Sequence, residues 1–479
     1  MTEAGPASVV VAGAGPAGLV AALVLGGYGI DVVVVDKRAG GSTLSRALVI
    51  STRCMEILRS WDMEDEVRAG AADVEPRAWV TRALVDDDGT EMPLGYPTAA
   101  EAAPVSPSRP AWAPQDHLEP LLVRRLATSR TVTLRYGVEL TGLEPDADCV
   151  RVALQDQATG RAEHVSARYV VGADGAHSRT RSLAGIVMDG RDDLAEFHRV
   201  EFRAPLTALV GERRYGLYVI TNPEAAGVLA SRGHGDRWGF SREWRPGEPR
   251  LVDASDEQLV ALLSTATGVP SLRPELEQRS AFSFAAQIAQ RYRDGPVFLV
   301  GDAAHRMTPR GGTGMNTAIQ DGYDVAWRLA WVLRGWAGRE LLDSYETVRR
   351  PVGLHNVERA GQADGARRDA DDALPWDLNG RVPHCWTVSA RDTVSTLDLV
   401  GAGLTLFAGP SDARWSNVSF ECRAPLTTHV LPEPDAAALE IAPGGARLVG
   451  PDGRDVCTWA RFGELEHRPV PGWCASSRR

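Results

Sequence analysis

The sequence is nearly devoid of lysine. Lys37 is the only lysine in 479 residues, so almost all of the positive charge is carried by arginine. A mechanism that needs a lysine in another part of the chain is therefore excluded. The six cysteines are widely scattered and form no Cys-x-x-Cys pair. That spacing fits neither a structural zinc site nor a dithiol redox centre, so we expect reduced, mostly buried thiols and no metal.

Long apolar runs and an excess of positive charge are also missing. No hydrophobic stretch reaches the roughly 18–20 residues that cross a bilayer. The chain passes from Met1 almost directly into a strand pattern, without a leader peptide. The net charge of −11 argues against nucleic acid as a partner. These features predict a cytoplasmic protein of two or three domains that acts on a small molecule, with no membrane or nucleic acid as partner and as a monomer or homodimer.

The first motif present is a βαβ pattern at the start of the chain. Residues 8–13 form an apolar run typical of a strand in a parallel sheet, and a glycine-rich turn, Gly13-Ala14-Gly15-Pro16-Ala17-Gly18, leads into an apolar helical stretch. In such a turn the first glycine makes the bend and the second lets the backbone approach a pyrophosphate. The third allows the helix to pack closely on the strand. The free N–H groups of the helix N-terminus complete an anion site.

A second predicted strand, residues 31–35, ends at Asp36. A carboxylate at this position can accept hydrogen bonds from a ribose hydroxyl, which makes the unit a dinucleotide site. Aspartate is shorter than glutamate, so the contact is expected to be long or water-mediated. The adjacent Lys37 is either a further contact or a solvated charge.

Two more strand–turn segments follow, at residues 168–181 and 296–305, and the second leads into a glycine-rich loop at residues 309–316. Each could be a structural turn by itself. In this order and spacing, however, the motifs resemble those of the FAD-dependent aromatic hydroxylases, in the phenol hydroxylase and polyketide-tailoring branch of the class A flavoprotein monooxygenases. The matching motifs are Gly13-x-Gly15-x-x-Gly18, Asp174-Gly175-x-x-Ser178-x-x-Arg181, Gly301-Asp302-Ala303-Ala304-His305, Gly311-Gly312-x-Gly314-Met315-Asn316 and Arg349-Arg350-Pro351.

This resemblance implies noncovalent FAD, with NADPH or NADH as a transient reductant. It places Asp302 near the ribityl and phosphate groups, Met315 and Asn316 at the isoalloxazine end, and Asp174 and Gly175 where FAD and nicotinamide are bound. The expected FAD contacts are Gly13, Gly15, Pro16, Ala17, Gly18, Asp36, Lys37, Arg46, Gln115, Val138, Asp174, Gly175, Asp302, Pro309, Gly312, Gly314, Met315 and Asn316. The alternatives are a surface ion pair for Arg46 and a helix-surface amide for Gln115.

Residues 185–285 carry short strand patterns and no nucleotide motif. The resemblance implies a substrate-binding sheet here, forming a roof over the flavin. Arg213, Tyr215 and Trp238 are candidates for contact with the substrate. The alternative for each is a place in the core, where aromatic residues of strands usually lie.

The resemblance also implies the domain organisation. The expected fold is α/β: a Rossmann-like FAD-binding domain with an inserted mixed β-sheet substrate domain and a C-terminal thioredoxin-like domain. The expected boundaries are residues 1–184 and 286–375 for the FAD-binding domain, 185–285 for the substrate domain and 376–479 for the C-terminal domain. The last lacks a redox cysteine pair, and we expect a structural role for it and for His384.

The predicted function is hydroxylation of a phenolic or polycyclic aromatic compound, in natural-product biosynthesis. In this family NAD(P)H reduces the flavin and O₂ adds at C4a to give a hydroperoxide that the aromatic ring attacks. No catalytic base can be assigned. The alternatives are a Baeyer–Villiger oxygenase on the same scaffold and a flavin-binding sensor or intermediate-binding protein without turnover. A flavin halogenase is excluded because it needs an active-site lysine.

Overall fold

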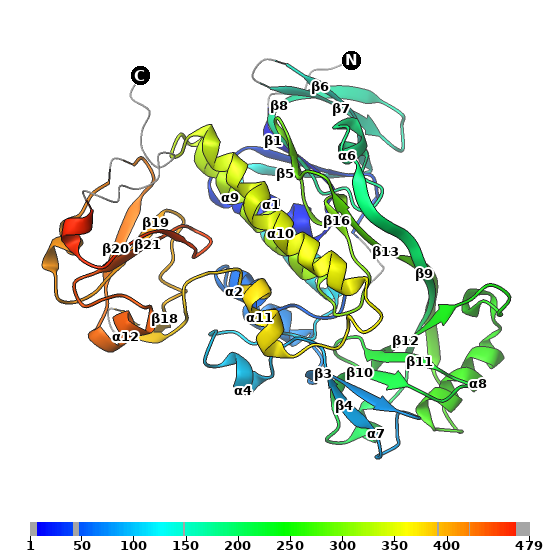
Figure 1. The fold of residues 1–479 in the computed structure, drawn as a ribbon. Coiled ribbons are helices and arrows are strands. Elements are labelled where there is room, and N and C mark those ends of the chain that lie inside the picture. The colour runs from blue at the N-terminus through cyan, green and yellow to red at the C-terminus, as the bar shows by residue number, and fades with distance from the viewer. Residues whose placement is uncertain (1–6, 42–46, 147–148, 390–391, 421, 466–479) are drawn as a thin grey trace.

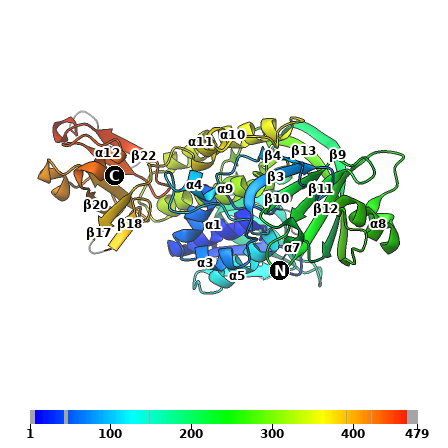
Figure 2. The ribbon, with the colours of Figure 1, turned by 90° about the horizontal axis from the view of Figure 1, so that it is seen from below.

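The computed structural model describes residues 7–41, 47–146, 149–389, 392–420 and 422–465. These residues form two eight-stranded sheets, a four-stranded sheet and a two-stranded hairpin. The first sheet lies beside a layer of long helices, the second sheet lies at one end of the molecule and the C-terminal strands lie at the other (Figures 1 and 2). No helix within the described ranges is long and apolar enough to cross a membrane.

The first sheet has the order β14-β15-β8-β1-β2-β5, and β7 joins the hairpin β6–β7 to β8. Its strands are β1 Ala7–Ala12, β2 Val32–Asp36, β5 Val132–Tyr136, β6 Val138–Pro145, β7 Val150–Asp156, β8 Ala162–Gly172, β14 Arg293–Asp294 and β15 Val297–Leu299. β1, β2, β5, β8 and β15 pair in parallel. Alternate side chains of β1 enter different cores: Val9 and Val11 pack against helices, whereas Val10 packs against β6 and β7.

The helices of the described chain are α1 Pro16–Gly27, α2 Thr52–Arg59, α3 Glu64–Ala69, α4 Ala99–Ala102, α5 Gln115–Leu126, α6 Arg179–Leu183, α7 Thr207–Val210, α8 Asp256–Thr267, α9 Gly314–Leu333, α10 Asp343–Ala360, α11 Ala370–Leu378 and α12 Glu433–Ala438. α1 and α9 pack against each other at unusually short range. A Cβ added at Gly322 would lie 2.2 Å from the carbonyl oxygen of Ala17, so only glycine permits this approach. The contact fixes the position of α9 relative to the glycine-rich turn before α1.

The second sheet has the order β16-β13-β9-β12-β11-β10-β3-β4. Its strands are β3 Glu75–Thr81, β4 Thr90–Pro93, β9 Met188–Arg203, β10 Tyr215–Ile220, β11 Gly227–Ser231, β12 Arg237–Trp244, β13 Glu275–Ala289 and β16 His305–Arg306. The long strands β9 and β13 run from the first sheet out to the second (Figure 1). β3 and β4 come from outside the segment 185–285, so the sheet is larger than the sequence patterns indicated.

The two faces of the second sheet have different environments. One face packs Phe202, Tyr218 and Phe240 against Leu263 of α8. On the opposite face Leu217 and Val219 pack against a core that contains Val49 and Trp112. This second face is the one turned toward the nucleotide-binding part of the chain.

The C-terminal part contains the hairpin of β17 Trp386–Ser389 and β18 Asp392–Ser395 and a sheet of order β20-β19-β21-β22. The sheet strands are β19 Leu404–Ala408, β20 Leu426–Val430, β21 Ala446–Val449 and β22 Asp455–Trp459, with β19–β20 parallel and the other two pairs antiparallel. This arrangement agrees with a thioredoxin-like sheet, and the fold class predicted from the sequence is confirmed. The described cysteines are free thiols, but only Cys54 is fully buried, so the expectation of mostly buried thiols is wrong.

Candidate active site

The three glycines of the first turn differ in what surrounds them. A Cβ added at Gly13, whose φ is +109°, would lie 2.1 Å from the carbonyl oxygen of Ala173. One added at Gly18 would lie 1.9 Å from the carbonyl oxygen of Gly13. A Cβ at Gly15 would meet no atom within 4 Å. The protein's own backbone therefore requires the first and third glycines, whereas the second faces open space, as expected where backbone approaches a ligand.

The N-terminus of α1 opens onto the same space. The helix starts at Pro16, and its cap residue Gly15 makes no side-chain hydrogen bond to the first turn. The first-turn N–H groups and the positive end of the helix dipole are thus left for an anion. The turn has the room and the donors that the pyrophosphate of FAD requires.

Asp36 lies at the end of β2, beside this turn, and is buried. Its carboxylate accepts hydrogen bonds from the N–H of Ala14 (2.8 Å) and from the backbone N–H, Nε and Nη2 of Arg38 (2.9, 3.0 and 2.9 Å). Burial opposes ionisation, but the bonds from Arg38 and Ala14 outweigh it and hold the pKa of Asp36 below its usual value. Four donors fill the acceptor sites of a carboxylate, so a ribose hydroxyl must displace one of them or bind through water. The basic residue that binds Asp36 is Arg38, which the sequence patterns did not indicate. Lys37, which was predicted to contact FAD, has an exposed side chain.

Asp302 lies where α1 and α9 meet. It follows Gly301 (φ +59°), whose added Cβ would lie 3.0 Å from Cβ of Ala318 on α9 and 3.3 Å from Cβ of Ala17 on α1. Asp302 itself is exposed, although Gly301 and Ala303 on either side are buried. Its carboxylate is therefore presented to the outside at the junction of the two helices.

The loop before α9 repeats the features of the first turn. Gly311 and Gly312 have φ of +81° and +65°, and a Cβ at Gly314 would meet nothing within 4 Å. α9 begins at Gly314 without a side-chain cap, and Met315 and Asn316 in its first turn are buried. The packing of α1 on α9 thus holds two helix N-termini, and at the start of each helix stands a glycine that faces open space.

The side chain of Asn316 is occupied by the protein. Its Oδ1 accepts a hydrogen bond from the N–H of Ser51 (2.8 Å), and its Nδ2 donates to the carbonyl oxygens of Val49 (3.1 Å) and Gly312 (3.2 Å). Asn316 therefore ties the segment before α2 to the start of α9. The Nδ2 donors are therefore used within the protein, while Oδ1 keeps one acceptor site.

Asp174, predicted to serve FAD and nicotinamide, is also held within the chain. Its carboxylate accepts hydrogen bonds from the Ser178 hydroxyl and from the N–H (2.8 Å) and hydroxyl (3.0 Å) of Thr180. These bonds fold the turn between β8 and α6, and the turn's Ala173 lies against Gly13. Asp174 thus fixes the turn whose Ala173 packs against Gly13.

A buried ionic network, which the sequence patterns did not reveal, fixes the loop that carries Asp302. Asp321 on α9 accepts from Nε of Arg349 (2.8 Å) and from the N–H of Gly301 (3.1 Å), and contacts Nε2 of His305 at 2.6 Å. Burial would raise the pKa of Asp321, but Arg349 and His305 outweigh it and hold the pKa below its usual value. The only sequence signal was that His305 and Arg349 belong to the matching motifs, without an indication that they meet at Asp321.

Two further residues that were predicted to contact FAD lie at the starts of α5 and β6. Gln115 begins α5, where its N–H donates to the carbonyl oxygen of Ala47 and its side-chain amide donates to Glu119 (2.6 Å). Val138 begins β6, next to Gly137, whose N–H donates to the carbonyl oxygen of Arg38. Arg46 lies outside the described residues.

The three candidate substrate residues do not lie on the face that is turned toward the nucleotide site. Trp238 is buried in the core that contains Leu263 of α8. Tyr215 stacks on Trp79, with ring centroids 5.5 Å apart, and Arg213 donates to backbone carbonyl oxygens near Val85. A β-bulge in the pairing of β10 with β3, between Tyr215 and Leu217, puts Tyr215 on the face opposite Leu217 and Val219. Trp238 points toward α8 because alternate residues of a strand point to opposite faces.

The face turned toward the nucleotide site carries other aromatic side chains. Phe197 of β9 stacks on Phe284 of β13 with ring centroids 4.2 Å apart, and Phe282 lies beside both. Arg310, in the glycine-rich loop before α9, lies 5.9 Å from the Phe284 ring centroid. The sheet and the loop predicted to hold the flavin are therefore in contact through these side chains.

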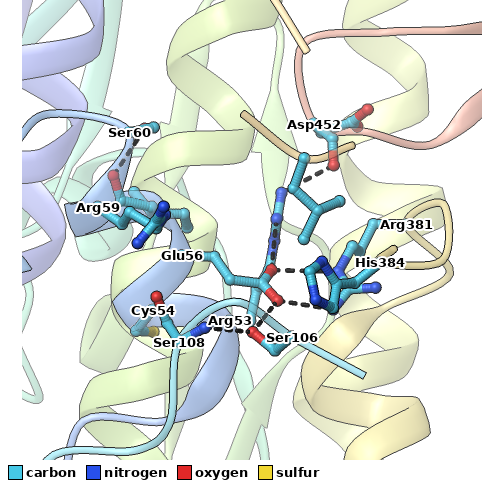
Figure 3. Close-up of polar contacts among 12 residues, drawn as sticks. Arg53, Cys54, Glu56, Arg59, Ser60, Ser106, Ser108, Arg381, His384 and Asp452 are labelled. Carbon is cyan, nitrogen blue, oxygen red and sulfur yellow. Dashed lines mark hydrogen bonds and ion pairs between the residues drawn. The ribbon is translucent and has the colours of Figure 1, made fainter. Parts of the chain in front are cut away.

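A buried cluster on α2 joins this region to the C-terminal part of the chain (Figure 3). Glu56 accepts two hydrogen bonds from Arg381 (2.6 and 3.1 Å), one from Arg53 (2.9 Å) and one from the Ser106 hydroxyl (2.7 Å). Burial would raise the pKa of Glu56, but the two arginines outweigh it and keep the pKa below its usual value. His384, nearby, pairs its Nδ1 with the Ser395 hydroxyl at 2.8 Å, which agrees with a structural role.

Known proteins are similar to this chain in sequence and in fold. The sequence profile of the family described as "FAD binding domain" matches residues 6–360. Tetracenomycin A2 monooxygenase-dioxygenase of Streptomyces glaucescens is 32% identical, over 93% of this chain and 92% of the relative. Aklavinone 12-hydroxylase DnrF of Streptomyces peucetius is 33% identical, over 85% of this chain and 92% of the relative.

Solved structures of flavin-dependent enzymes are also similar to this chain. The flavin-dependent monooxygenase PieE, in complex with FAD and substrate, superposes with a TM-score of 0.87 at 25% identity, covering 96% of this chain and 97% of that one. Aklavinone-11 hydroxylase, in a ternary complex with FAD and aklavinone, gives a TM-score of 0.84 at 29% identity, with 96% of each chain covered.

Proposed function

This chain belongs to the FAD binding domain family, as an FAD-dependent aromatic hydroxylase, and we propose that it uses NAD(P)H and O₂ to hydroxylate a phenolic or polycyclic aromatic compound. One observation above all supports the proposal. The glycines that face open space, Gly15 and Gly314, stand at the starts of α1 and α9, and Asp302 lies exposed between the two helices. The arrangement suits a cofactor whose phosphates bind at one helix and whose ring binds at the other.

We propose that the AMP half and pyrophosphate are bound by the turn Gly13–Gly18 together with Asp36, Lys37 and Val138, and the ring by the loop Pro309–Asn316. Gln115, Arg46, Asp174, Gly175 and Asp302 complete the proposed contacts. The four segments 1–184, 185–285, 286–375 and 376–479 stay our proposed division of the chain. FAD, when bound, supplies the electron transfer and the oxygen activation.

The protein's own contribution is to place an aromatic ring and to exclude water. The second sheet presents Phe197, Phe282 and Phe284 beside Arg310 of the loop proposed to hold the flavin. These side chains suit the face of an electron-rich ring through stacking. Two relatives are named for tetracenomycin and aklavinone, and another is named "Putative polyketide hydroxylase". We propose a polycyclic aromatic substrate of that kind, within natural-product biosynthesis.

The test is to purify the protein with FAD and to follow NADPH and NADH oxidation and O₂ uptake with phenols and hydroxyquinones. We expect an aromatic compound to stimulate both, with one ¹⁸O atom from ¹⁸O₂ entering the product as a hydroxyl. Insertion of ¹⁸O into a ring as an ester or lactone would instead identify a Baeyer–Villiger oxygenase. FAD binding without stimulated oxidation by any such compound would identify a non-catalytic flavin protein.

A further inference from the structure

A pocket that is partly open to solvent lies beside the first turns of α9. It is lined by the loop of Tyr96, by Thr313 and Asn316 at the start of α9, and by residues of α10 and α11. α11 lies beside α2, next to the start of the C-terminal part of the chain (Figure 1). The pocket thus adjoins the loop that we propose for the flavin ring, on the side of α9 that faces α10.

Two arginines line this pocket without an ion pair. Arg359 of α10 and Arg368, which precedes α11, are both half-buried. Among the residues that the structure describes, no carboxylate oxygen lies within 4.0 Å of either guanidinium. Elsewhere the half-buried and buried arginines commonly pair with acids, as Arg349 does with Asp321 and Arg381 with Glu56.

The hydrogen bonds of these two arginines leave donors unused. Arg359 donates to the carbonyl oxygen of Gly365 and to the Thr313 hydroxyl (3.2 Å), but its Nε is buried without a partner. Arg368 donates from Nη2 to the carbonyl oxygen of Asp372. A guanidinium has five N–H groups, so each can still donate to a ligand.

The charge balance in the pocket is positive. Burial and, after it, the charge of Arg359 together lower the pKa of Arg368 to about 10, and burial also lowers the pKa of Arg359. Both stay cationic near pH 7. The nearest acid on the pocket wall, Asp377, already accepts from the Ser51 hydroxyl (2.6 Å), the N–H of Arg53 (3.0 Å) and the Gln320 amide (2.9 Å), and burial raises its pKa.

We propose that this pocket binds an ionised acidic oxygen of the substrate, such as the enolate of a hydroxyquinone, a phenolate or a carboxylate, between Arg359 and Arg368. The inference rests on the proposed function, because it places the anionic end of an aromatic substrate next to the flavin loop. The walls around the two guanidinium groups include Tyr96, Pro97 and Trp376, which suit an aromatic acid better than a bare phosphate. The substrate would therefore be recognised as an anion, and the arginines would also stabilise its ionised, more nucleophilic form.

The test uses the FAD-loaded protein without reductant, so that no turnover is needed. The probes are 2-hydroxy-1,4-naphthoquinone, which is an anion at neutral pH, and its neutral 2-methoxy ether, each followed by the change in the flavin absorbance spectrum. The variants are R359Q and R368Q, and R367Q serves as the matched control because Arg367 is exposed. Loss of one charge-assisted hydrogen bond should raise the Kd of the hydroxy compound about tenfold or more, leave that of the ether within about twofold, and leave R367Q like the wild type.

R368K tests the charge separately if R368Q folds poorly. Lysine keeps a point charge, so its Kd should lie between those of the wild type and R368Q. Equal losses for both probes, no loss in either arginine variant or no binding of the anion to the wild type would overturn the proposal. A rise in the KM for NADPH instead of the Kd for the naphthoquinone would assign the pocket to a phosphate of the reductant and would also overturn it. The proposed function is tested separately: it fails if the wild type binds no FAD or oxidises no NADPH in the presence of an aromatic compound, whatever the Kd values of the naphthoquinones.

Discussion

At the scale of single residues, the structure separates positions that serve the fold from positions that face a ligand. Gly13 and Gly18 are required by backbone contacts within the protein, while Gly15 and Gly314 border open space. Asp321 is fully buried and paired, whereas Asp302, in the segment that Asp321 holds through the N–H of Gly301, is exposed. Motif membership alone does not distinguish these roles.

The two kinds of glycine should respond differently to the same substitution. G15A adds a methyl group to the space proposed for the pyrophosphate, and the φ of −82° suits alanine. We expect its Kd for FAD to rise at least tenfold, about 1.4 kcal/mol, with the thermal midpoint of the FAD-free protein unchanged. G18A should instead destabilise the FAD-free protein by about 1–3 kcal/mol through overpacking. Titration of flavin fluorescence and urea unfolding measure the two effects, and equal destabilisation by both variants would contradict the assignment.

At the scale of elements, buried ion pairs connect helices to segments far away in the sequence. Asp324 of α9 pairs with Arg328 (2.8 Å) and with Arg454 of the C-terminal part (2.6 Å). Glu56 of α2 pairs with Arg381 in the same manner. The C-terminal part is therefore attached to both α9 and α2 by charges that are removed from water.

Asp324 should make stability depend on pH at the acid end. Burial would raise its pKa, but Arg328, Arg454 and Arg349 outweigh this and lower it to about 2. Because the folded pKa lies below the unfolded value of about 3.9, the stabilisation is fully present above that value and is lost as the pH falls toward 2. The difference in unfolding free energy between wild type and D324N should therefore shrink by about 2 kcal/mol as the pH falls from 6 to 2. Urea unfolding between pH 2 and 7 measures it, and a difference that does not vary with pH would contradict this account.

The Glu56–Arg381 pair should contribute far more than an exposed pair of the same elements. Removal of one partner leaves a buried charge, so E56Q or R381Q should cost about 3–5 kcal/mol of unfolding free energy. The matched control is R59Q, which breaks the partly exposed pair with Asp398 and should cost at most about 1 kcal/mol. Denaturant unfolding of the three variants, with the double variant E56Q/R381Q, gives the coupling energy. Similar costs for the buried and the partly exposed pair would contradict the role of the cluster.

At the scale of the whole molecule, the proposed FAD site is assembled from segments that are distant in the chain. The turn before α1, the Gly301–Asp302 segment and the loop before α9 are brought together by the parallel sheet and by the contact of Gly322 with Ala17. A ligand that binds all three segments binds the folded state only.

FAD should therefore stabilise the entire fold. At a free concentration 100 times its Kd, it should add about 2.7 kcal/mol to the free energy of unfolding. Thermal melts of the FAD-free protein at increasing FAD concentrations should show a rising midpoint, and AMP alone should give a smaller rise because it omits the α9 end of the site. A midpoint that does not depend on FAD would contradict a site built from these three segments.

Local sequence patterns specify the backbone conformation of the proposed FAD site. Glycines at fixed offsets after apolar runs specify turns that other residues cannot form, so the βαβ unit and the loop before α9 could be predicted. The second sheet is larger than the predicted segment 185–285, because β3 Glu75–Thr81 and β4 Thr90–Pro93 carry no recognisable motif and lie far before β9 in the chain.

The tertiary structure alone decided which side chains meet. Arg38 instead of Lys37 binds Asp36, and His305, Asp321 and Arg349 come together from three elements. The placement of Trp238 in the α8 core depends on strand register, which flips every side chain when it shifts by one residue. Arg359 and Arg368 share a pocket only because α10 and the segment before α11 fold against α9. Short-range patterns specify backbone turns, whereas such pairings follow from the packing of distant elements.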